Sequence, residues 1–282
     1  MTLDLRGDAE RVAGVALAED GPADITSDVT LPPGAAGRGV IVCRTAGVLA
    51  GTLYADAVAR QCGCTCEWRA SDGARMAVGE TAATITGTIG AILRAERPLL
   101  NLLQRASGIA TATRAYVDAV AGTGTRILHT RKTAPGLRLL DVSAVLAGGG
   151  DVHRLDLASA VMVKDNHWRG LSAGSRSLGD ALAQARAAGA GTLHVEIESE
   201  TQLRQACAAG ASRLLIDNRE PATVREWARL ARQLAPGIEI EATGGITLAT
   251  VRAFADAGAD FVSVGALTHS VQAADISLEL SD

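Results

Sequence analysis

Aromatic side chains are scarce in this chain: phenylalanine, tyrosine and tryptophan together make up 2% of its 282 residues. Alanine, valine, leucine and isoleucine must therefore build the core, and hydrophobic residues of all kinds reach 48% of the sequence. This content supports a sizeable core and argues against disorder. Because single cores rarely grow past about 250–300 residues, the chain is expected to form one large or two modest domains.

Long apolar runs are also missing. No stretch reaches the roughly 18–20 uninterrupted apolar residues of a transmembrane helix, and the charged first residues lack the apolar region of a signal peptide. Neither sign of charge is in large excess: the net charge is −4, which argues against a nucleic-acid or anionic-membrane surface. We therefore expect a cytoplasmic protein that binds neither nucleic acid nor a membrane.

Several familiar catalytic motifs have no counterpart in the sequence. No histidine pair has zinc-ligand spacing, no Gly-x-Ser-x-Gly elbow occurs, and no Gly-x-Gly-x-x-Gly follows an opening strand. The five cysteines, an odd number, indicate reduced thiols. Cys62, Cys64 and Cys66 alternate as on one face of a strand, so packing as small apolar groups is favoured over metal binding.

The pattern of apolar residues and glycines divides the chain into two parts. The first part mixes helices and strands, and a long helical stretch at 92–121 follows it, with a junction of two helices expected near Ser107 and Gly108. In the first part we expect a helix at 8–18, a turn at 24–27, strands within 37–53, 63–70 and 81–88, and a helix near 52–62.

Regular alternation of strands and helices follows. Strands are expected at 125–130, 160–164, 192–197, 213–217, 238–243 and 261–265, with helices at 137–147, 176–189, 201–209, 221–234 and 247–257. Repeated units of this kind demand parallel strands and right-handed crossovers, which form either a barrel or an open doubly wound sheet.

Each expected strand of this second part ends in residues too polar or too small for a strand interior. These are Thr130-Arg131-Lys132, Lys164-Asp165-Asn166, Glu196, Asp217, Thr243-Gly244-Gly245 and Gly265. The carboxyl ends of barrel strands form the active-site face, whereas a doubly wound sheet gathers such residues at one switch point. The even spread therefore favours a barrel.

The chemistry expected at this face is the binding of a ligand with several anionic groups. Cationic side chains gather there, namely Arg131, Lys132, His153, Arg154 and Lys164. Arginine suits planar carboxylates, and lysine supplies a compact charge. The glycines that end the last two strands let backbone N–H groups approach a phosphate.

Two carboxylates accompany these cations at the same face. Glu196 and Asp217 end neighbouring strands, where they are expected to contact Mg²⁺, ribose hydroxyls or a developing positive charge. The alternative is a salt bridge with Lys164 or Arg131. His167 is expected to act as a helix cap or as a ligand, and His129 is assigned to the core.

Taken together, these motifs resemble the quinolinate phosphoribosyltransferase family over nearly the whole chain. The matching stretches are Ala95-Glu96-Arg97, Leu100-Asn101-Leu102-Leu103-Gln104, Ser107-Gly108-Ile109-Ala110-Thr111, Thr130-Arg131-Lys132-Thr133, Gly148-Gly149-Gly150, His153-Arg154, Lys164-Asp165-Asn166-His167, Val195-Glu196, Asp217-Asn218, Gly244-Gly245-Ile246 and Ser263-Val264-Gly265-Ala266-Leu267-Thr268-His269-Ser270. The order and spacing of the set are far more specific than any one motif.

The resemblance implies an N-terminal α/β sandwich domain at 1–106, with the tail 270–282 packing back on it, and an incomplete α/β barrel at 107–269. It implies a homodimer with shared active sites that joins quinolinate to phosphoribosyl pyrophosphate in NAD biosynthesis, with Mg²⁺ as cofactor. The implied catalytic residues are Lys132, Glu196 and Asp217, of which Glu196 and Asp217 also hold the metal. The implied substrate-binding residues are Arg97 from a neighbouring subunit, Thr130, Arg131, Lys132, His153, Arg154, Lys164, Glu196, Asp217, Thr243, Gly244, Gly245, Gly265, Ala266 and Leu267.

The sequence departs from the family pattern near the acceptor pocket. Val152 stands where asparagine is common, Asp156 where glycine is common and Thr243 where serine is common. Two alternatives therefore stay open: a phosphoribosyltransferase of the same fold with a different acceptor, and a non-catalytic protein that senses a phosphorylated anion.

Overall fold

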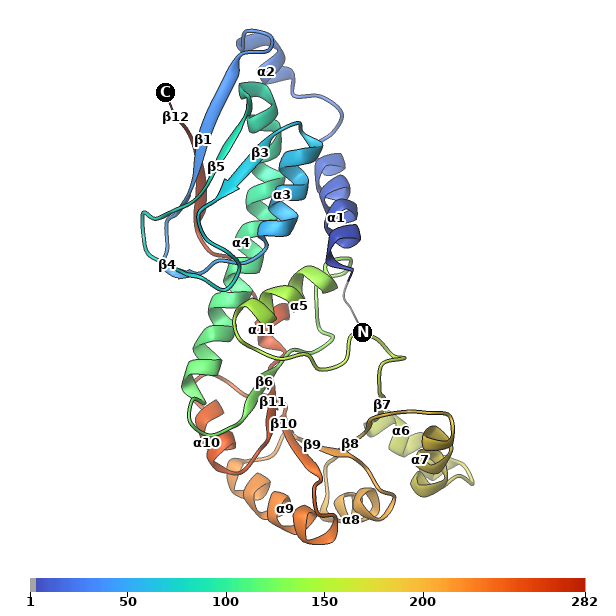
Figure 1. Ribbon diagram of the computed structural model, residues 1–282. Coiled ribbons are helices and arrows are strands. Elements are labelled where there is room, and N and C mark those ends of the chain that lie inside the picture. Colours follow the sequence, from blue (N-terminus) through green and yellow to red (C-terminus); the bar gives the residue numbers. More distant parts are fainter. Residues whose placement is uncertain (1–3, 282) are drawn as a thin grey trace. The chain divides into compact units, whose positions relative to one another are not determined.

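The computed structural model describes residues 4–281, which form two compact units (Figure 1). The first unit contains the chain up to residue 114, residues 132–150 and the chain from residue 266 onward, and the second contains residues 115–131 and 151–265. The segments 107–114, 132–150 and 266–269, assigned to the barrel domain from the sequence, thus group with the first unit. One reason is that the helix at 138–147 packs on the helix at 5–19.

The first unit contains a four-stranded antiparallel sheet in the order β12-β1-β5-β3 and a small β2-β4 pair. The C-terminal strand β12 pairs with β1 from Arg38↔Ser281 to Cys43↔Ile276, so the tail is an edge strand of this sheet. The elements of the unit are α1 (Leu5–Glu19), α2 (Ile25–Thr30), β1 (Ala36–Cys43), β2 (Gly47–Val48), α3 (Thr52–Gln61), β3 (Thr65–Trp68), β4 (Arg75–Met76), β5 (Thr81–Thr88), α5 (Arg138–Ala147), α11 (Ala266–His269) and β12 (Ile276–Ser281), together with most of α4 (Ile89–Ala119).

Helix α4 is continuous over 31 residues, so the expected junction near Ser107 and Gly108 is wrong. These small residues serve close packing. The Ser107 hydroxyl donates to the carbonyl of Ala50, and a Cβ on Gly108 would collide with the backbone around Ala273. Within residues 4–281, no helix is both long and apolar enough to cross a membrane.

The expected turn at 24–27 is also wrong, because helix α2 begins there. The carboxylate of Asp24 accepts hydrogen bonds from the backbone N–H groups of Thr26 and Ser27, both at 3.1 Å. Asp24 thus satisfies donors that a helix N-terminus leaves without partners, which is why a polar, turn-like sequence starts a helix.

The second unit is a six-stranded parallel sheet in the order β6-β11-β10-β9-β8-β7. Strands β7 to β11 follow one another in chain order, and β6 joins the far side of β11, so the order is circular with the β6 and β7 edges left open. A circular order is that of a barrel with one seam unclosed, and the expected incomplete α/β barrel is confirmed. The elements are β6 (Arg126–Leu128), β7 (Val161–Val163), α6 (Asp165–Ala173), α7 (Leu178–Ala187), β8 (Leu193–Ile197), α8 (Glu200–Ala208), β9 (Arg213–Asp217), α9 (Pro221–Leu234), β10 (Glu239–Thr243), α10 (Val251–Asp256) and β11 (Phe261–Ser263).

A buried ion pair ties the discontinuous segments of the first unit together. Arg105 of α4 donates two hydrogen bonds of 2.8 Å to the carboxylate of Asp141 in α5, which is fully buried. The same carboxylate accepts the Ala134 N–H at 3.1 Å, and Arg105 also donates to the Thr268 carbonyl at 3.1 Å. The pair therefore ties segment 132–150 and the segment after 266 to α4.

We predict that Asp141→Asn lowers the free energy of unfolding by about 3 kcal/mol, because it leaves Arg105 without its anion. This value is the lower end of the range of about 3–5 kcal/mol for breaking a buried ion pair. We expect the lower end because 24% of the Arg105 side chain is exposed. Denaturant unfolding measures the change. The control is Glu200→Gln, which breaks the exposed Glu200–Arg204 pair on α8 and should alter stability by no more than about 0.5 kcal/mol. Equal effects of the two variants would contradict a structural role for the buried pair.

Candidate active site

Two cationic segments of the second unit are held beside each other at the carboxyl end of β6. Asp151 lies beside this strand, forms a parallel bridge with Leu128 and pairs with Arg126 at 2.7 Å. The fully buried His129 accepts the backbone N–H of His153 through Nε2 at 3.1 Å, so its Nδ1 carries the hydrogen that meets the Thr130 carbonyl. These contacts anchor His153 and Arg154 near the strand end that carries Thr130 and Arg131.

Arg131 and Arg154 lack full compensation of their charge. The buried Nε of Arg131 has no hydrogen-bond partner within residues 4–281. Burial, together with the positive charge of Arg131, lowers the pKa of Arg154, and the opposing negative charge of Asp156 offsets only part of this effect. The Nη1 of Arg154 donates to the Ala160 carbonyl at 3.3 Å. Two guanidinium groups that repel each other in a partly buried place favour the binding of an anion.

Lys164 and Glu196 come from the ends of the paired strands β7 and β8. The Lys164 ammonium lies 2.9 Å from the Glu196 carboxylate, so the structure contains the salt bridge that the sequence left as an alternative. The Lys164 side chain remains 43% exposed, whereas that of Glu196 is 9% exposed. Of the two roles expected for His167, the structure shows the helix cap: its Nδ1 accepts the Lys164 N–H at 3.0 Å at the start of α6.

The turns after β9 and β10 contact each other. Asn218 donates its backbone N–H to the Thr243 carbonyl at 3.0 Å and its side-chain amide to Asp217 at 2.7 Å. Gly244 and Gly245 follow with φ values of +85° and +62°, a region that glycine enters without steric strain. Asp217, Thr243 and the two glycines therefore lie together, as the sequence predicts, at the carboxyl edge of the sheet.

The first unit holds four of the remaining predicted residues, Arg97, Lys132, Ala266 and Leu267. The Lys132 carbonyl accepts a hydrogen bond of 2.9 Å from the Thr268 hydroxyl. Ala266 and Leu267 begin the short helix α11, and Gly265 immediately before them is the last residue of the second unit. Arg97 projects from α4 with 60% of its side chain exposed, and its nearest carboxylate, that of Glu96, is 3.8 Å away. That distance exceeds a hydrogen bond, so the pair is loose.

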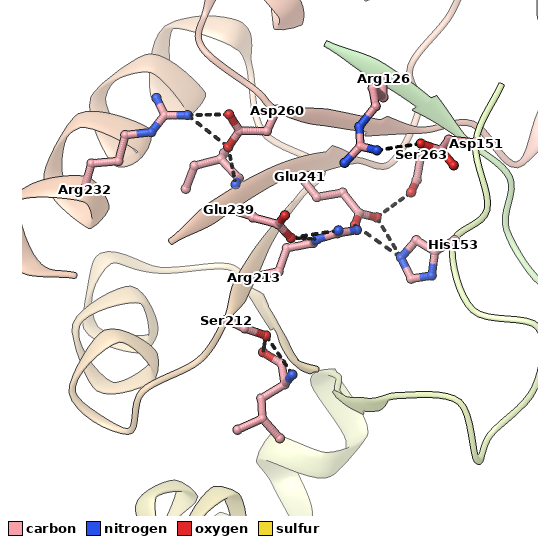
Figure 2. Close-up of polar contacts among 12 residues, drawn as sticks. Arg126, Asp151, His153, Ser212, Arg213, Arg232, Glu239, Glu241, Asp260 and Ser263 are labelled. Atoms are coloured by element: carbon pink, nitrogen blue, oxygen red, sulfur yellow. Dashed lines mark hydrogen bonds and ion pairs between the residues drawn. The ribbon is translucent and has the colours of Figure 1, made fainter. Parts of the chain in front are cut away.

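The sequence analysis missed a buried polar cluster inside the second unit (Figure 2). At its centre is Glu241 of β10, 1% exposed, which contacts His153, Arg213 and Ser263. Burial raises the pKa of Glu241, but hydrogen bonds from His153 and Ser263 and the charges of His153 and Arg213 outweigh it and lower the pKa. The signal in the sequence was glutamate alternating with apolar residues in a strand of a parallel sheet, which should be apolar on both faces.

The carboxylates and thiols of the chain differ in how well they suit a metal ion. Within residues 4–281, no group of three or more His, Cys, Asp or Glu side chains could hold an ion. Mg²⁺ commonly takes one or two carboxylates and completes its shell with water and substrate phosphates, so Glu196 and Asp217 fit a shared site of this kind. The thiol of Cys66 is unlike a metal ligand, because burial raises its pKa to about 12.

We predict that Gly244→Ala destabilises the second unit more than Gly237→Ala does. Both glycines have positive φ, +85° and +89°, so each substitution costs about 1–2 kcal/mol from backbone strain. Only at Gly244 would the new Cβ also meet a neighbour, 2.8 Å from the backbone nitrogen of Asn218 and against its side-chain amide. Denaturant unfolding of both variants gives the comparison, and equal losses would contradict the close approach of the two turns.

Comparisons with known proteins relate the chain to one family. A family model described as the N-terminal domain of quinolinate phosphoribosyl transferase matches residues 24–107, and one described as the C-terminal domain matches residues 109–279. Nicotinate-nucleotide pyrophosphorylase [carboxylating] of Mycobacterium leprae is 41% identical over 91% of this chain and 91% of its own. The Homo sapiens protein of that name is 38% identical over 84% of this chain and 80% of its own.

Solved structures give the same result. The nicotinate-nucleotide pyrophosphorylase of Francisella tularensis superposes with a TM-score of 0.90 at 31% identity, covering 98% of this chain and 97% of that one. That of Ehrlichia chaffeensis has a TM-score of 0.86 at 29% identity and covers 100% of both chains. Sequence and structure together place this chain in the quinolinate phosphoribosyltransferase family.

Proposed function

We propose that this protein transfers the phosphoribosyl group of phosphoribosyl pyrophosphate to quinolinate, with loss of carbon dioxide, to give nicotinate mononucleotide and pyrophosphate in NAD biosynthesis. Membership of the family supports the reaction class. The observation that carries the choice of acceptor is the pair of incompletely compensated guanidinium groups, Arg131 and Arg154, held beside each other at the carboxyl end of β6.

Quinolinate is a planar pyridine with two adjacent carboxylates, and the cations of the second unit match it. Arg131 and Arg154 can each form two parallel hydrogen bonds with a carboxylate, and Lys164 adds a compact charge. Binding the dianion relieves the repulsion between the two arginines. It also supplies an acceptor for the buried Nε of Arg131, whose lack of a partner carries a desolvation penalty.

The acidic residues serve the phosphoribosyl side. Loss of pyrophosphate leaves positive charge at the anomeric carbon of ribose, and the carboxylates of Glu196 and Asp217 would stabilise this charge. Glu196 and Asp217 would also hold Mg²⁺, which when bound neutralises charge on the pyrophosphate. The backbone N–H groups around Gly244, Gly245 and Gly265 are assigned to the phosphates.

The pyridine nitrogen of quinolinate then attacks the anomeric carbon. The nitrogen becomes quaternary, and its positive charge stabilises the electron pair left on the adjacent ring carbon when the carboxylate leaves as carbon dioxide. That carbon then takes up a proton from water. Two polyanions must be held together for this step, and correct orientation of reactants alone can be worth about 7–11 kcal/mol. Positioning by fixed cations is thus the main contribution that this site would make.

We predict that Arg131→Ala and Arg154→Ala each weaken quinolinate binding by about 2–5 kcal/mol, the range for removing one partner of a buried charge pair. Steady-state kinetics with quinolinate, read as carbon dioxide and nicotinate mononucleotide, gives the KM, and calorimetry gives the affinity. The matched control is Arg225→Ala, which removes an exposed arginine from α9 and should leave both values unchanged. Normal quinolinate affinity in both site variants would exclude this assignment, and absence of turnover in the unaltered protein would exclude the reaction.

We further propose that the protein is a homodimer in which Arg97 completes the site of the partner subunit. The support is the family resemblance at Ala95-Glu96-Arg97, together with the exposure of Arg97 and its loose contact with Glu96. A two-fold interface places the same patch of each subunit against the other, so one residue can serve the neighbouring site. Localisation in the cytoplasm stays a prediction from the sequence.

A mixing experiment tests the sharing of sites. Arg97→Ala and Lys164→Ala chains, each inactive alone, are combined so that subunits exchange. Shared sites predict up to about half of the unaltered activity per heterodimer, because one of its two sites is intact. The control mixes Lys164→Ala with Arg131→Ala, which should stay inactive because both changes lie in the same unit. Failure of the first mixture to recover, with heterodimers demonstrated, would refute sharing.

A further inference from the structure

A buried carboxylate lies behind one of the candidate acceptor-binding residues. His153 and Arg154 sit on a segment without regular secondary structure between Asp151 and Ala160, so their orientation depends on contacts from neighbouring strands. The backbone of His153 is held by His129, as described above. Its side chain, only 7% exposed, is held by Glu241, whose carboxylate lies 3.2 Å from Nε2 (Figure 2).

Glu241 is itself fixed by residues of the two neighbouring strands, β9 and β11. Arg213 of β9 donates to Glu241 at 3.1 Å and to Glu239 at 2.8 Å, and Ser263 of β11 donates its hydroxyl to the other Glu241 oxygen. The Arg213 guanidinium also lies 3.7 Å from the ring centroid of Phe261. Three adjacent strands thus hold the carboxylate in one place, as preorganised support for a binding residue requires.

The groups around Glu241 leave its remaining negative charge facing His153. The ring of His194 meets His153 edge-on with centroids 5.4 Å apart. Burial, with the positive charges of Arg213 and His153, lowers the pKa of His194 to about 4, so His194 is neutral near pH 7. Arg213 already divides its charge between Glu239 and Glu241. His153 is therefore the group that the remaining negative charge of Glu241 faces.

A carboxylate can accept only from a nitrogen that bears hydrogen, so Nε2 of His153 carries one, and the other ring nitrogen, Nδ1, points away from Glu241. When both nitrogens are protonated, Nδ1 becomes a charged donor for an anion. We propose that Glu241 is a positioning residue that orients His153 so that Nδ1 donates to a carboxylate of the acceptor substrate. This inference rests on the proposed function, and it makes Glu241 act on acceptor binding without touching the substrate.

Kinetics with paired variants tests the consequence. Glu241→Gln should raise the KM for quinolinate roughly ten- to a hundredfold, the loss expected for one charge-assisted hydrogen bond, and change the KM for phosphoribosyl pyrophosphate by less than about twofold. The matched control is Glu239→Gln, which makes the same change two residues earlier on β10, also pairs with Arg213 and does not contact His153. It should leave both KM values within about twofold. In a His153→Gln background, Glu241→Gln should add no more than about twofold, because the residue that it acts through is gone.

Nitrogen NMR in the absence of substrate tests directly whether Glu241 holds the ring of His153. The nitrogen NMR signals of the ring of His153, identified by their loss in His153→Gln, should shift in Glu241→Gln and stay in place in Glu239→Gln. If Glu241→Gln does not fold, Ser263→Ala decides, since it removes one hydrogen bond to the carboxylate and keeps the charge. It should shift the same signals and raise the KM for quinolinate in the same selective way.

The outcomes separate the two proposals. Absence of quinolinate turnover in the unaltered protein would count against the proposed function, while the NMR signals would still decide whether Glu241 holds His153. Equal rises in both KM values, a full effect that persists in the His153→Gln background, or unmoved His153 signals would overturn the role of Glu241.

Discussion

Strand β6 pairs in parallel with β11, the first strand of the second unit with the last, and the arrangement of its candidate site depends on this pairing. The register runs from Phe261↔Arg126 to Ser263↔Leu128, and the Val264 N–H continues it to the Leu128 carbonyl at 3.1 Å. Phe261 reinforces the edge, because the guanidinium groups of Arg126 and Arg213 lie 4.5 and 3.7 Å from its ring centroid. By joining the ends of the series, the pairing gives the sheet the circular order of a barrel.

The parallel direction of the strands also determines where charged side chains meet. All strands of the sheet are parallel, so their carboxyl ends lie along one edge, and the polar residues that follow them must be satisfied there. At this edge Lys164 pairs with Glu196. Inside the sheet, His153 and Arg213, the first residue of β9, share Glu241. Arg131 and Arg154 keep part of their charge uncompensated. An apolar ligand would leave that charge buried, whereas a dianion offsets it, which explains why the surplus of cations points to a polycarboxylate acceptor.

Much of the fold followed from local pattern. The predicted strands at 213–217 and 81–88 and the helix at 221–234 coincide with β9, β5 and α9, because alternation, buried runs and helix starts are written in neighbouring residues. Local pattern failed where the same residue type is common in two different local structures. Gly108 suggested a helix junction and instead permits the backbone near Ala273 to approach α4. Asp24 suggested a turn and is the N-cap of α2.

The sequence by itself determined the parallel alternating architecture and the chemical character of its strand ends, since these depend on periodicity and residue type within short segments. Only the tertiary structure decided which charges meet. Glu196 might have faced Arg131 as readily as Lys164 on sequence grounds, and nothing local assigned Glu241 to His153. Such pairings depend on strand register and burial across segments far apart in the chain, where a few ångströms and the loss of water decide the strength of each contact.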